Sequence, residues 1–427
     1  MGKTTITKVY GRQVYTIRGH PGVEAIVCTE GGIKERAVCT SGISVGTHEI
    51  KFKYDTDKKF EGKGVQSAVD SINNKIAPVL LGMDASNQLA ADKAMLEICP
   101  NAKAELGGNA VAACSAAILK AGAASLDLPL YQHIGGTKAM YLPVPGVLAF
   151  DGSDRYGGGV TTPGGKPSNS FMMYGFETFA EASYAGWEID RLWGKELKQH
   201  FHAVQNHLGA YYIPPDIFKS DLEIWDLMSK TIDKAGYTGK AGIQVDCAAD
   251  TYYDRSGKIY RGLFINKEMD RDALLDFYKK AVSELPIVIL EDPFWEDDYE
   301  SHAILTKELD IQIVGDDLFT TTPERVAKGI KQGAANTVLL KVNQVGTISE
   351  ALEMVQLAYN YGYGVMPCDS RGEGVAMVDY AVGINAGTVR EMALGERANR
   401  FLEIEEELGT RARFWGERGL KGRRFFK

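Results

Sequence analysis

The segment from Ile287 to Gln344 reads IVILEDPFWEDDYESHAILTKELDIQIVGDDLFTTTPERVAKGIKQGAANTVLLKVNQ. It holds three short apolar runs, and a side chain that can bind a metal or move a proton closes each run: Glu291, Asp316 and Lys341. Successive members of this set are 25 positions apart, close to the ~30 residues of one strand-and-helix unit in an eightfold barrel. The segment therefore predicts consecutive parallel strands joined by helices.

A fourth run of the same kind lies upstream, where IQVD (243–246) ends on Asp246. A buried parallel strand has this apolar pattern, and the strands of a (β/α)8 barrel direct their C-terminal ends into one mouth. We therefore expect three carboxylates and a lysine to converge there, where the acids would suit a hard cation such as Mg²⁺. A cation would also disfavour the ammonium form of Lys341 and make it a candidate base. The structural alternatives are helix capping by the acids and a buried ion pair for the lysine.

Upstream of this barrel pattern the chain changes character. Residues 1–55 alternate apolar and polar side chains between turn signals, which predicts an antiparallel meander. Residues 65–126 are rich in alanine and helical in pattern. Strands followed by helices indicate a small α+β domain, which we place at residues 1–135, with the barrel at residues 140–427.

Two barrel helices are marked in the sequence. Thr347 and Glu350 form a capping box, and the helix that follows is predicted to bury the face Ile348, Leu352, Val355 and Tyr359. In the preceding helix, Thr322 is the expected cap, Pro323 takes the first position and Gly333 marks the exit.

Composition places the chain among ordinary globular proteins, with 44% hydrophobic and 24% charged residues. The net charge of −8 argues against nucleic acid or an anionic membrane as a partner. No apolar stretch reaches the length of a signal peptide or a membrane span, and the six cysteines show no CxxC pairing. We expect a cytoplasmic protein with reduced thiols.

Several longer motifs resemble the enolase family. They are EDPFWEDD (291–298), GDDLFTTTPERVAKGI (315–330), LLKVNQVGTISEA (339–351), IEEELG (404–409), SGISVGTHE (41–49), GGNAVAACSAAILKAGA (107–123) and LPVPGVL (142–148). Together they extend over almost the whole chain. The resemblance implies an α/β fold, an irregular (β/α)8 TIM-type barrel preceded by an N-terminal α+β domain, and assembly as a homodimer or a higher homo-oligomer.

The resemblance also implies roles for individual residues. Three acids, Asp246, Glu291 and Asp316, fall where the family has its magnesium ligands, and Lys341 matches the lysine that removes the proton next to the substrate carboxylate. Ser44 lies in a loop that resembles the mobile lid of enolase, which closes on the phosphate side of the substrate and on a second Mg²⁺. The neighbouring acids, Asp292, Asp297, Asp298 and Asp317, are interpreted as helix caps or solvated groups.

The sequence departs from the family pattern on the substrate side. The family's SHRSGE becomes CDSRGE (368–373), so that Asp369, Ser370 and Arg371 are the candidates for binding a substrate oxyanion. The family's second active-site lysine is replaced by Arg390, which keeps the charge but shuttles protons poorly.

Two glutamates that help the family expel or add water are also missing. Ala210 lies near the position of one, and Ser170 replaces the other. The family's histidine loop becomes a longer, glycine-rich stretch without histidine at residues 151–169. A lid over a different or larger substrate and a disordered insertion are the two interpretations of that stretch.

These losses leave three hypotheses for function. The leading one is a Mg²⁺-dependent enzyme that forms an enolate from a small phospho- or phosphono-carboxylate in a secondary pathway, as a lyase or transferase resembling carboxyphosphonoenolpyruvate synthase. The second is a phosphopyruvate hydratase, with its missing acids replaced from the long loop by Asp151 or Asp154. The third is an inactive binding protein, against which the intact acids and Lys341 argue.

Overall fold

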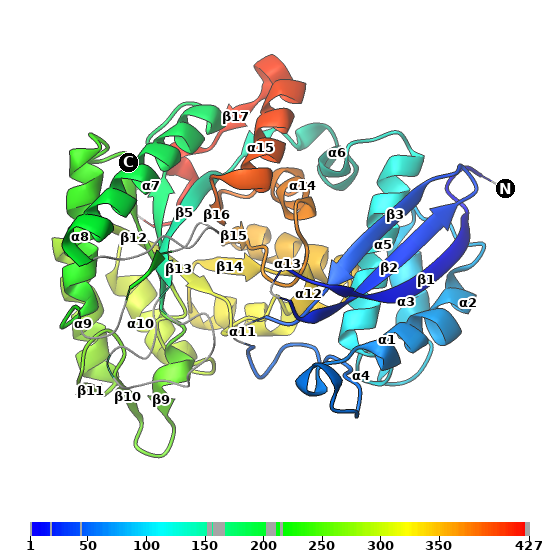
Figure 1. The fold of residues 1–427 in the computed structure, drawn as a ribbon, viewed down its shortest axis with the longest axis horizontal. Coiled ribbons are helices and arrows are strands. Elements are labelled where there is room, and N and C mark those ends of the chain that lie inside the picture. Colours follow the sequence, from blue (N-terminus) through cyan, green and yellow to red (C-terminus); the bar gives the residue numbers. More distant parts are fainter. Residues whose placement is uncertain are drawn as a thin grey trace.

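The computed structural model describes residues 2–17, 19–42, 45–151, 156, 167–201, 211–213 and 217–422. These residues form two units that lie side by side, an N-terminal sheet with helices and a larger barrel (Figure 1). Each unit has its own hydrophobic core, and the partly buried Ala37 packs against both cores.

The N-terminal unit is built on three antiparallel strands in the order β1 (Ile6–Tyr15), β2 (Pro21–Thr29) and β3 (Lys34–Cys39). The strand β2 is almost entirely buried because α5 (Gly108–Ser125) packs against it. Small side chains let α5 approach its neighbours closely, since a Cβ on Gly122 would lie 2.5 Å from the carbonyl oxygen of Ala85. The meander and the alanine-rich helical region are therefore confirmed.

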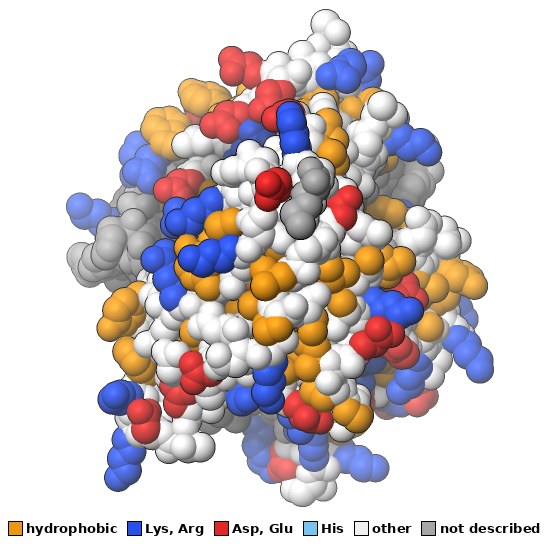
Figure 2. Space-filling view, turned by 90° about the vertical axis from the view of Figure 1, so that its right-hand side faces the viewer, with side chains coloured by type: hydrophobic (Ala, Val, Ile, Leu, Met, Phe, Trp, Pro, Cys, Tyr) orange, Lys and Arg blue, Asp and Glu red, His pale blue; other side chains and the backbone are white. Residues whose placement is uncertain are grey.

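The other helices of this unit surround α5. They are α1 (Gln66–Ser71), the π-helical turn η2 (Ile72–Ile76), α2 (Ala77–Leu80), α3 (Gln88–Leu96), α4 (Ala102–Leu106) and α6 (Leu130–Gly135). The outer side of the N-terminal unit presents apolar side chains among its charges (Figure 2). Exposed large apolar residues of this unit include Tyr15, Ile17, Val79, Leu81 and Leu89.

The barrel is a nearly closed sheet of eight main strands. In spatial order they are β15 (Gly364–Pro367), β14 (Thr337–Leu340), β13 (Gln312–Gly315), β12 (Ile287–Glu291), β8 (Ala241–Asp246), β6 (Ser168–Met173), β5 (Val144–Asp151) and β16 (Thr388–Met392). The strand β6 is antiparallel to both β5 and β8, whereas every other neighbouring pair in this order is parallel. The first and last strands of the order, β15 and β16, also lie against each other. The predicted irregular barrel is confirmed.

Helices cover the outside of the barrel (Figure 1). They are α7 (Phe179–Phe201), α8 (Asp221–Lys234), α9 (Arg271–Glu284), α10 (Tyr299–Glu308), α11 (Pro323–Gln332), the short α12 (Val342–Val345), α13 (Ile348–Asn360), α14 (Ala376–Gly383) and α15 (Gly395–Leu408). Short strands complete the unit: β4 (Tyr141–Leu142), β7 (Tyr211–Tyr212), β9 (Tyr253–Asp254), β10 (Ile259–Arg261), β11 (Glu268–Met269) and β17 (Arg413–Phe414).

The predicted helix ends are correct in position but not in every detail. Thr347 caps α13 by accepting a hydrogen bond from the amide of Glu350, and Gly333 ends α11 in the left-handed region at φ 71°. Thr322 is the N-cap residue of α11, yet its hydroxyl donates to the carbonyl of Thr320 instead of capping the helix. The buried face of α13 was predicted wrongly at two positions, because Leu352 is half-buried and Tyr359 is exposed. Ala351, Met354 and Ala358 are buried instead.

The six cysteines all lie in the described residues and carry free thiols. Among the described residues, no single helix combines the length and the apolar composition needed to cross a membrane. The helices Gly108–Ser125 and Leu130–Lys138 reach that standard only when taken together, and they are bent by 96° at the break between them.

Candidate active site

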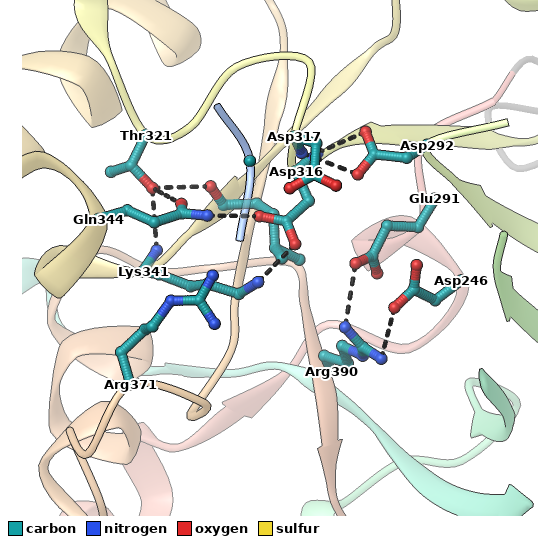
Figure 3. Close-up of polar contacts among 12 residues, drawn as sticks. Asp246, Glu291, Asp292, Asp316, Asp317, Thr321, Lys341, Gln344, Arg371 and Arg390 are labelled. Carbon is teal, nitrogen blue, oxygen red and sulfur yellow. Dashed lines mark hydrogen bonds and ion pairs between the residues drawn. The ribbon is translucent and has the colours of Figure 1, made fainter. Parts of the chain in front are cut away.

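Four of the predicted residues lie at the C-terminal ends of neighbouring strands. Asp246 and Glu291 are the last residues of β8 and β12, while Asp316 and Lys341 follow β13 and β14 directly. All four are buried, and they converge on the mouth of the barrel (Figure 3). Strand ends that had been inferred from apolar runs thus do form one polar cluster.

Lys341 makes an ion pair with Asp316. Its Nζ contacts Oδ2 of Asp316, while the side-chain amide of Gln344 donates to Oδ1 at 2.9 Å. Burial alone would raise the pKa of Asp316, but the charges of Lys341 and Arg371 and these hydrogen bonds lower it to about 2. Burial would lower the pKa of Lys341, yet the charge of Asp316 raises it above its ordinary value. In this geometry the ion pair with Asp316 favours the ammonium form of Lys341. The expectation that a cation beside Lys341 disfavours that form stays a prediction.

Arg390, on β16, joins the other two acids. Its guanidinium lies 2.7 Å from Oδ2 of Asp246 and 3.0 Å from Oε1 of Glu291, and it donates to the hydroxyl of Ser168 at 2.6 Å. Burial opposes the charged form, but Asp246 and Glu291 outweigh that effect and raise the pKa of Arg390. Figure 3 shows this bridge beside the separate pair of Lys341 and Asp316.

Asp292 and Asp317 are buried within the same cluster, so the interpretation of these two acids as solvated groups is wrong. The carboxylate of Asp292 accepts from the amides of Asp316 at 3.0 Å and Asp317 at 2.8 Å, and this fixes the turn after β13. Burial, followed by the charges of Asp317, Asp316 and Glu291, raises the pKa of Asp292 well above its usual range. Asp298 is a helix cap as predicted, because it accepts from the amide of Ser301 at the start of α10.

The donor set fits a divalent cation. Carboxylate oxygens of Glu291, Asp292 and Asp316 lie within 4.8 Å of one another. Five buried acids gather at the mouth, namely Asp246, Glu291, Asp292, Asp316 and Asp317, and among the described residues the cations paired with this cluster are Lys341 and Arg390. Buried carboxylates in excess of buried cations are neutralised either by protons or by a further positive charge such as a metal ion. Oxygen ligands of this kind are those preferred by Mg²⁺.

The predicted oxyanion-binding segment lies on the same side of the barrel. Arg371 is buried and pairs with Glu49, which contacts both its Nη2 and its Nε. Asp369 accepts from the amide of Gly374 at 2.9 Å and faces Arg397 at 3.4 Å, and Ser370 is half-buried. Arg371 therefore reaches the mouth, whereas Asp369 serves the turn that carries it.

Residues 45–50, here called the lid segment, bring Glu49 to Arg371. The amide of Thr47 donates to Glu296 at 2.9 Å, and His48 lies 3.1 Å from Asp297 in the loop after β12. Asp297 also pairs with Arg325 at 3.0 Å. The lid segment of the N-terminal unit is thus fastened to the barrel. Ser44, the predicted lid residue, lies outside the described residues.

Two family models match the chain. The model described as "Enolase, N-terminal domain" matches residues 6–134, and the model described as "Enolase, C-terminal TIM barrel domain" matches residues 140–422. The chain belongs to the enolase family.

Curated enolases resemble the chain over nearly its whole length. Enolase of Methanocaldococcus jannaschii is 39% identical over 415 residues, which are 95% of this chain and 96% of the relative. Enolase of Methanopyrus kandleri is 39% identical over 423 residues, covering 96% of this chain and 97% of the relative. Enolase of Bifidobacterium animalis subsp. lactis is 39% identical over 432 residues, covering 97% and 98%. Membership of the enolase family, inferred from the motifs, is confirmed and indicates a carbon–oxygen lyase.

The enolase pattern has glutamates at two positions that this chain replaces, and the structure describes one of them, Ser170. Ser170, on β6, is buried and is the register partner of Gln244 on β8. The amide of Gln244 donates to Oε2 of Glu291 at 3.2 Å. Ala210, Asp154 and most of the glycine-rich stretch lie outside the described residues.

Sequence reasoning did not single out Glu49, Gln344 or Gln244, although each contacts a predicted site residue in this enolase-family fold. Glu49 ends the quoted motif SGISVGTHE, and Gln344 lies within LLKVNQVGTISEA, three residues after Lys341. Their location in motifs shared with the enolase family was the signal that could have identified these two residues. Gln244 occupies an inward position of a buried strand, where a polar side chain needs a partner.

Proposed function

We propose that the protein is a magnesium-dependent carbon–oxygen lyase that removes the proton next to the carboxylate of a small phosphorylated acid. The observation that carries the proposal is the contact of Lys341 with Asp316 at the edge of the buried acid cluster. The first reaction to test is the dehydration of 2-phosphoglycerate to phosphoenolpyruvate, the phosphopyruvate hydratase reaction, because the curated relatives are enolases.

Asp246, Glu291 and Asp316 would hold the Mg²⁺ ion, which supplies positive charge where abstraction places a second negative charge on the substrate carboxylate. Lys341 accepts the α-proton, and the electrons of the broken C–H bond pass to the carboxylate as an enolate. These electrons then form the new double bond as the C–O bond on the neighbouring carbon breaks, and the departing hydroxide takes up a proton and leaves as water. Lys341 must first become neutral, so Asp316 has to release it from the ion pair that now raises its pKa.

The cations at the mouth support an anionic substrate. Arg371, Lys341 and Arg390 are all buried there, and a guanidinium can bind a phosphate or carboxylate through two parallel hydrogen bonds. Arg371 is engaged by Glu49, so an incoming oxyanion would replace that carboxylate. The bound molecule we propose is a small carboxylate that carries a phosphate or phosphonate group.

Two observations favour a second candidate function. Ser170 offers a buried hydroxyl where the family pattern has a carboxylic acid, and Arg390 does not lose its proton. Both weaken acid assistance to a departing hydroxyl. The second candidate is therefore the same proton abstraction followed by loss or transfer of a different group from a larger phosphono-carboxylate, as in a carboxyphosphonoenolpyruvate synthase-like enzyme.

One experiment separates the two candidates. The protein is incubated with 2-phosphoglycerate and Mg²⁺ in D₂O, and both phosphoenolpyruvate absorbance and deuterium at the α-carbon are followed. Turnover at the ordinary enzyme rate of roughly 10–100 s⁻¹ supports the hydratase. Deuterium exchange at the α-carbon supports the second candidate if dehydration is slower than that rate by a factor of ~10²–10⁴, which is the usual contribution of a general acid. If neither deuterium exchange nor product formation is observed, both candidate functions are contradicted.

We further infer that the protein is a homo-oligomer, as enolases usually are. The exposed apolar side chains of the N-terminal unit support a contact surface between copies. Light scattering after size-exclusion chromatography tests this expectation, and a monomer at micromolar concentration would contradict it.

A further inference from the structure

Arg390 is placed to compete with a metal ion. Its guanidinium contacts carboxylates from two strands, Asp246 at 2.7 Å and Glu291 at 3.0 Å, and these two acids are predicted metal ligands. Its third contact, with Ser168 at 2.6 Å, comes from β6 and fixes the plane of the group. The side chain of Arg390 is only 9% exposed, so solvent does not weaken these interactions appreciably.

The acids that face Arg390 have few oxygen atoms to spare. Glu291 accepts from Arg390 at Oε1 and from Gln244 at Oε2, so both of its oxygens are engaged. A magnesium ion would need oxygens of this kind at about 2.1 Å, closer than any hydrogen-bond donor approaches. It would also place two positive charges beside a guanidinium that does not deprotonate in proteins.

We infer that Arg390 acts as a built-in counter-cation: it neutralises Asp246 and Glu291 when Mg²⁺ is absent and opposes Mg²⁺ binding at the same acids. This inference rests on the metal site of the proposed function but goes beyond it, because it makes one residue set the metal affinity. A lysine at this position could place its single ammonium against one carboxylate, whereas the guanidinium bridges two. Arg390 is thus a positioning residue for the acids.

The test measures Mg²⁺ binding without turnover. Isothermal titration with MgCl₂ compares the wild-type chain with Arg390→Met and Arg390→Lys, and thermal unfolding is recorded for each in EDTA and in Mg²⁺. Arg390→Met should bind Mg²⁺ roughly tenfold more tightly or better, since an adjacent like charge is removed. It should also melt at lower temperature in EDTA and show a larger Mg²⁺-induced rise in Tm. Arg390→Lys should fall between the two proteins.

A matched control removes a partly buried arginine that pairs with a buried acid elsewhere. Arg400 on α15 contacts Asp379 at 2.8 Å, away from the acid cluster. Arg400→Met should lower Tm without changing the Mg²⁺ affinity or the Mg²⁺-induced rise. This variant separates loss of an ion pair from relief of competition.

The outcomes distinguish this inference from the proposed function. Tighter binding in Arg390→Met supports the inference, and if the wild-type chain does not bind Mg²⁺ while Arg390→Met does, the inference stands and the magnesium-dependent function falls. Equal or weaker binding in Arg390→Met overturns the inference, while a binding wild type leaves the function intact. Absence of binding in both proteins overturns both.

Discussion

Asp316 has two roles: it is a predicted metal ligand, and it forms an ion pair with Lys341, the predicted base. Its two oxygens are divided between Lys341, which directly follows β14, and Gln344 on α12. Because one carboxylate serves both, a change at Asp316 should affect both metal binding and proton transfer, whereas a change at Lys341 should impair proton transfer alone.

Asp316→Asn should weaken Mg²⁺ binding by roughly tenfold or more, since the site loses a negative charge while the side chain keeps its shape. Calorimetric titration measures the affinity. Asp298→Asn, which alters the cap of α10 instead of the acid cluster, should bind as the wild type does. Unchanged affinity in Asp316→Asn would remove this residue from the ligand set.

Lys341→Met should abolish α-proton exchange with D₂O, because the substitution removes the amine that we propose as the acceptor of the α-proton. Mg²⁺ affinity should not fall, and should rise if the charge of Lys341 also opposes the metal ion at Asp316. Nuclear magnetic resonance of the substrate α-proton provides the measurement. Exchange that persists would move the base to another residue.

At the scale of elements, the lid segment and the turn that carries Arg371 face each other across the mouth. The first is fastened by Thr47 and His48 to the loop after β12, and the second is fixed by Asp369 and Glu373. Glu49 and Arg371 join the two elements. Loosening either element should therefore expose the mouth without unfolding the barrel.

Thr47→Val removes the hydroxyl that donates to Glu296. The lost hydrogen bond should weaken local closure by about 0.5–1.5 kcal/mol and raise amide exchange of the lid segment several-fold. Hydrogen exchange with mass spectrometry reads this out peptide by peptide. Thr7→Val, which removes an exposed hydroxyl bond to Cys28, should leave the lid segment unchanged.

Glu373 should make stability depend on pH. Burial of its carboxyl group, followed by the charge of Asp369, raises its pKa from 4.5 to about 7. Because the folded-state pKa is the higher one, its stabilising contribution is full below about pH 4.5 and is lost as the pH rises through about 7. Glu373→Gln should therefore reduce the stability difference between about pH 5 and about pH 8 in urea unfolding. An undiminished difference would place the titration elsewhere.

At the scale of the whole molecule, the strands and their polar ends were predictable, whereas their partners were not. Apolar runs of fixed length reveal buried strands, and a barrel fixes where those strands end. The bridge from Arg390 to Glu291 spans 99 positions, and the pair of Arg371 with Glu49 spans 322. No local pattern records such pairings. The errors on α13 have the same origin. Two sets of apolar side chains overlap on the surface of this helix, and the packing of neighbouring helices decides which set is buried.

The two units are also joined by Asp92, a buried acid on α3. It accepts from the hydroxyl of Ser115 at 2.6 Å, and across the units from the amide and hydroxyl of Ser349 at 3.0 and 2.7 Å. Asp92→Ala should destabilise the protein by about 1–3 kcal/mol, because buried donors lose their acceptor. Urea unfolding measures this, and Asp226→Ala, which breaks an exposed pair with Lys230, should change little.

Because β6 runs against its neighbours, the connection from β5 to β6 begins and ends at the rim that carries the acids. Asp151 and Ser168 are register partners there, and Ser168 is in turn level with Asp246. A connection of this kind can gain or lose residues without displacing a helix, since the hydrogen bonds of the strand pair keep its ends fixed. During divergence, insertions in the connection from β5 to β6 could reshape the surroundings of the substrate while the strands that carry the acids stay as they are. The antiparallel β6 thus allows substrate specificity to change in evolution while the catalytic acids on the neighbouring strands are kept.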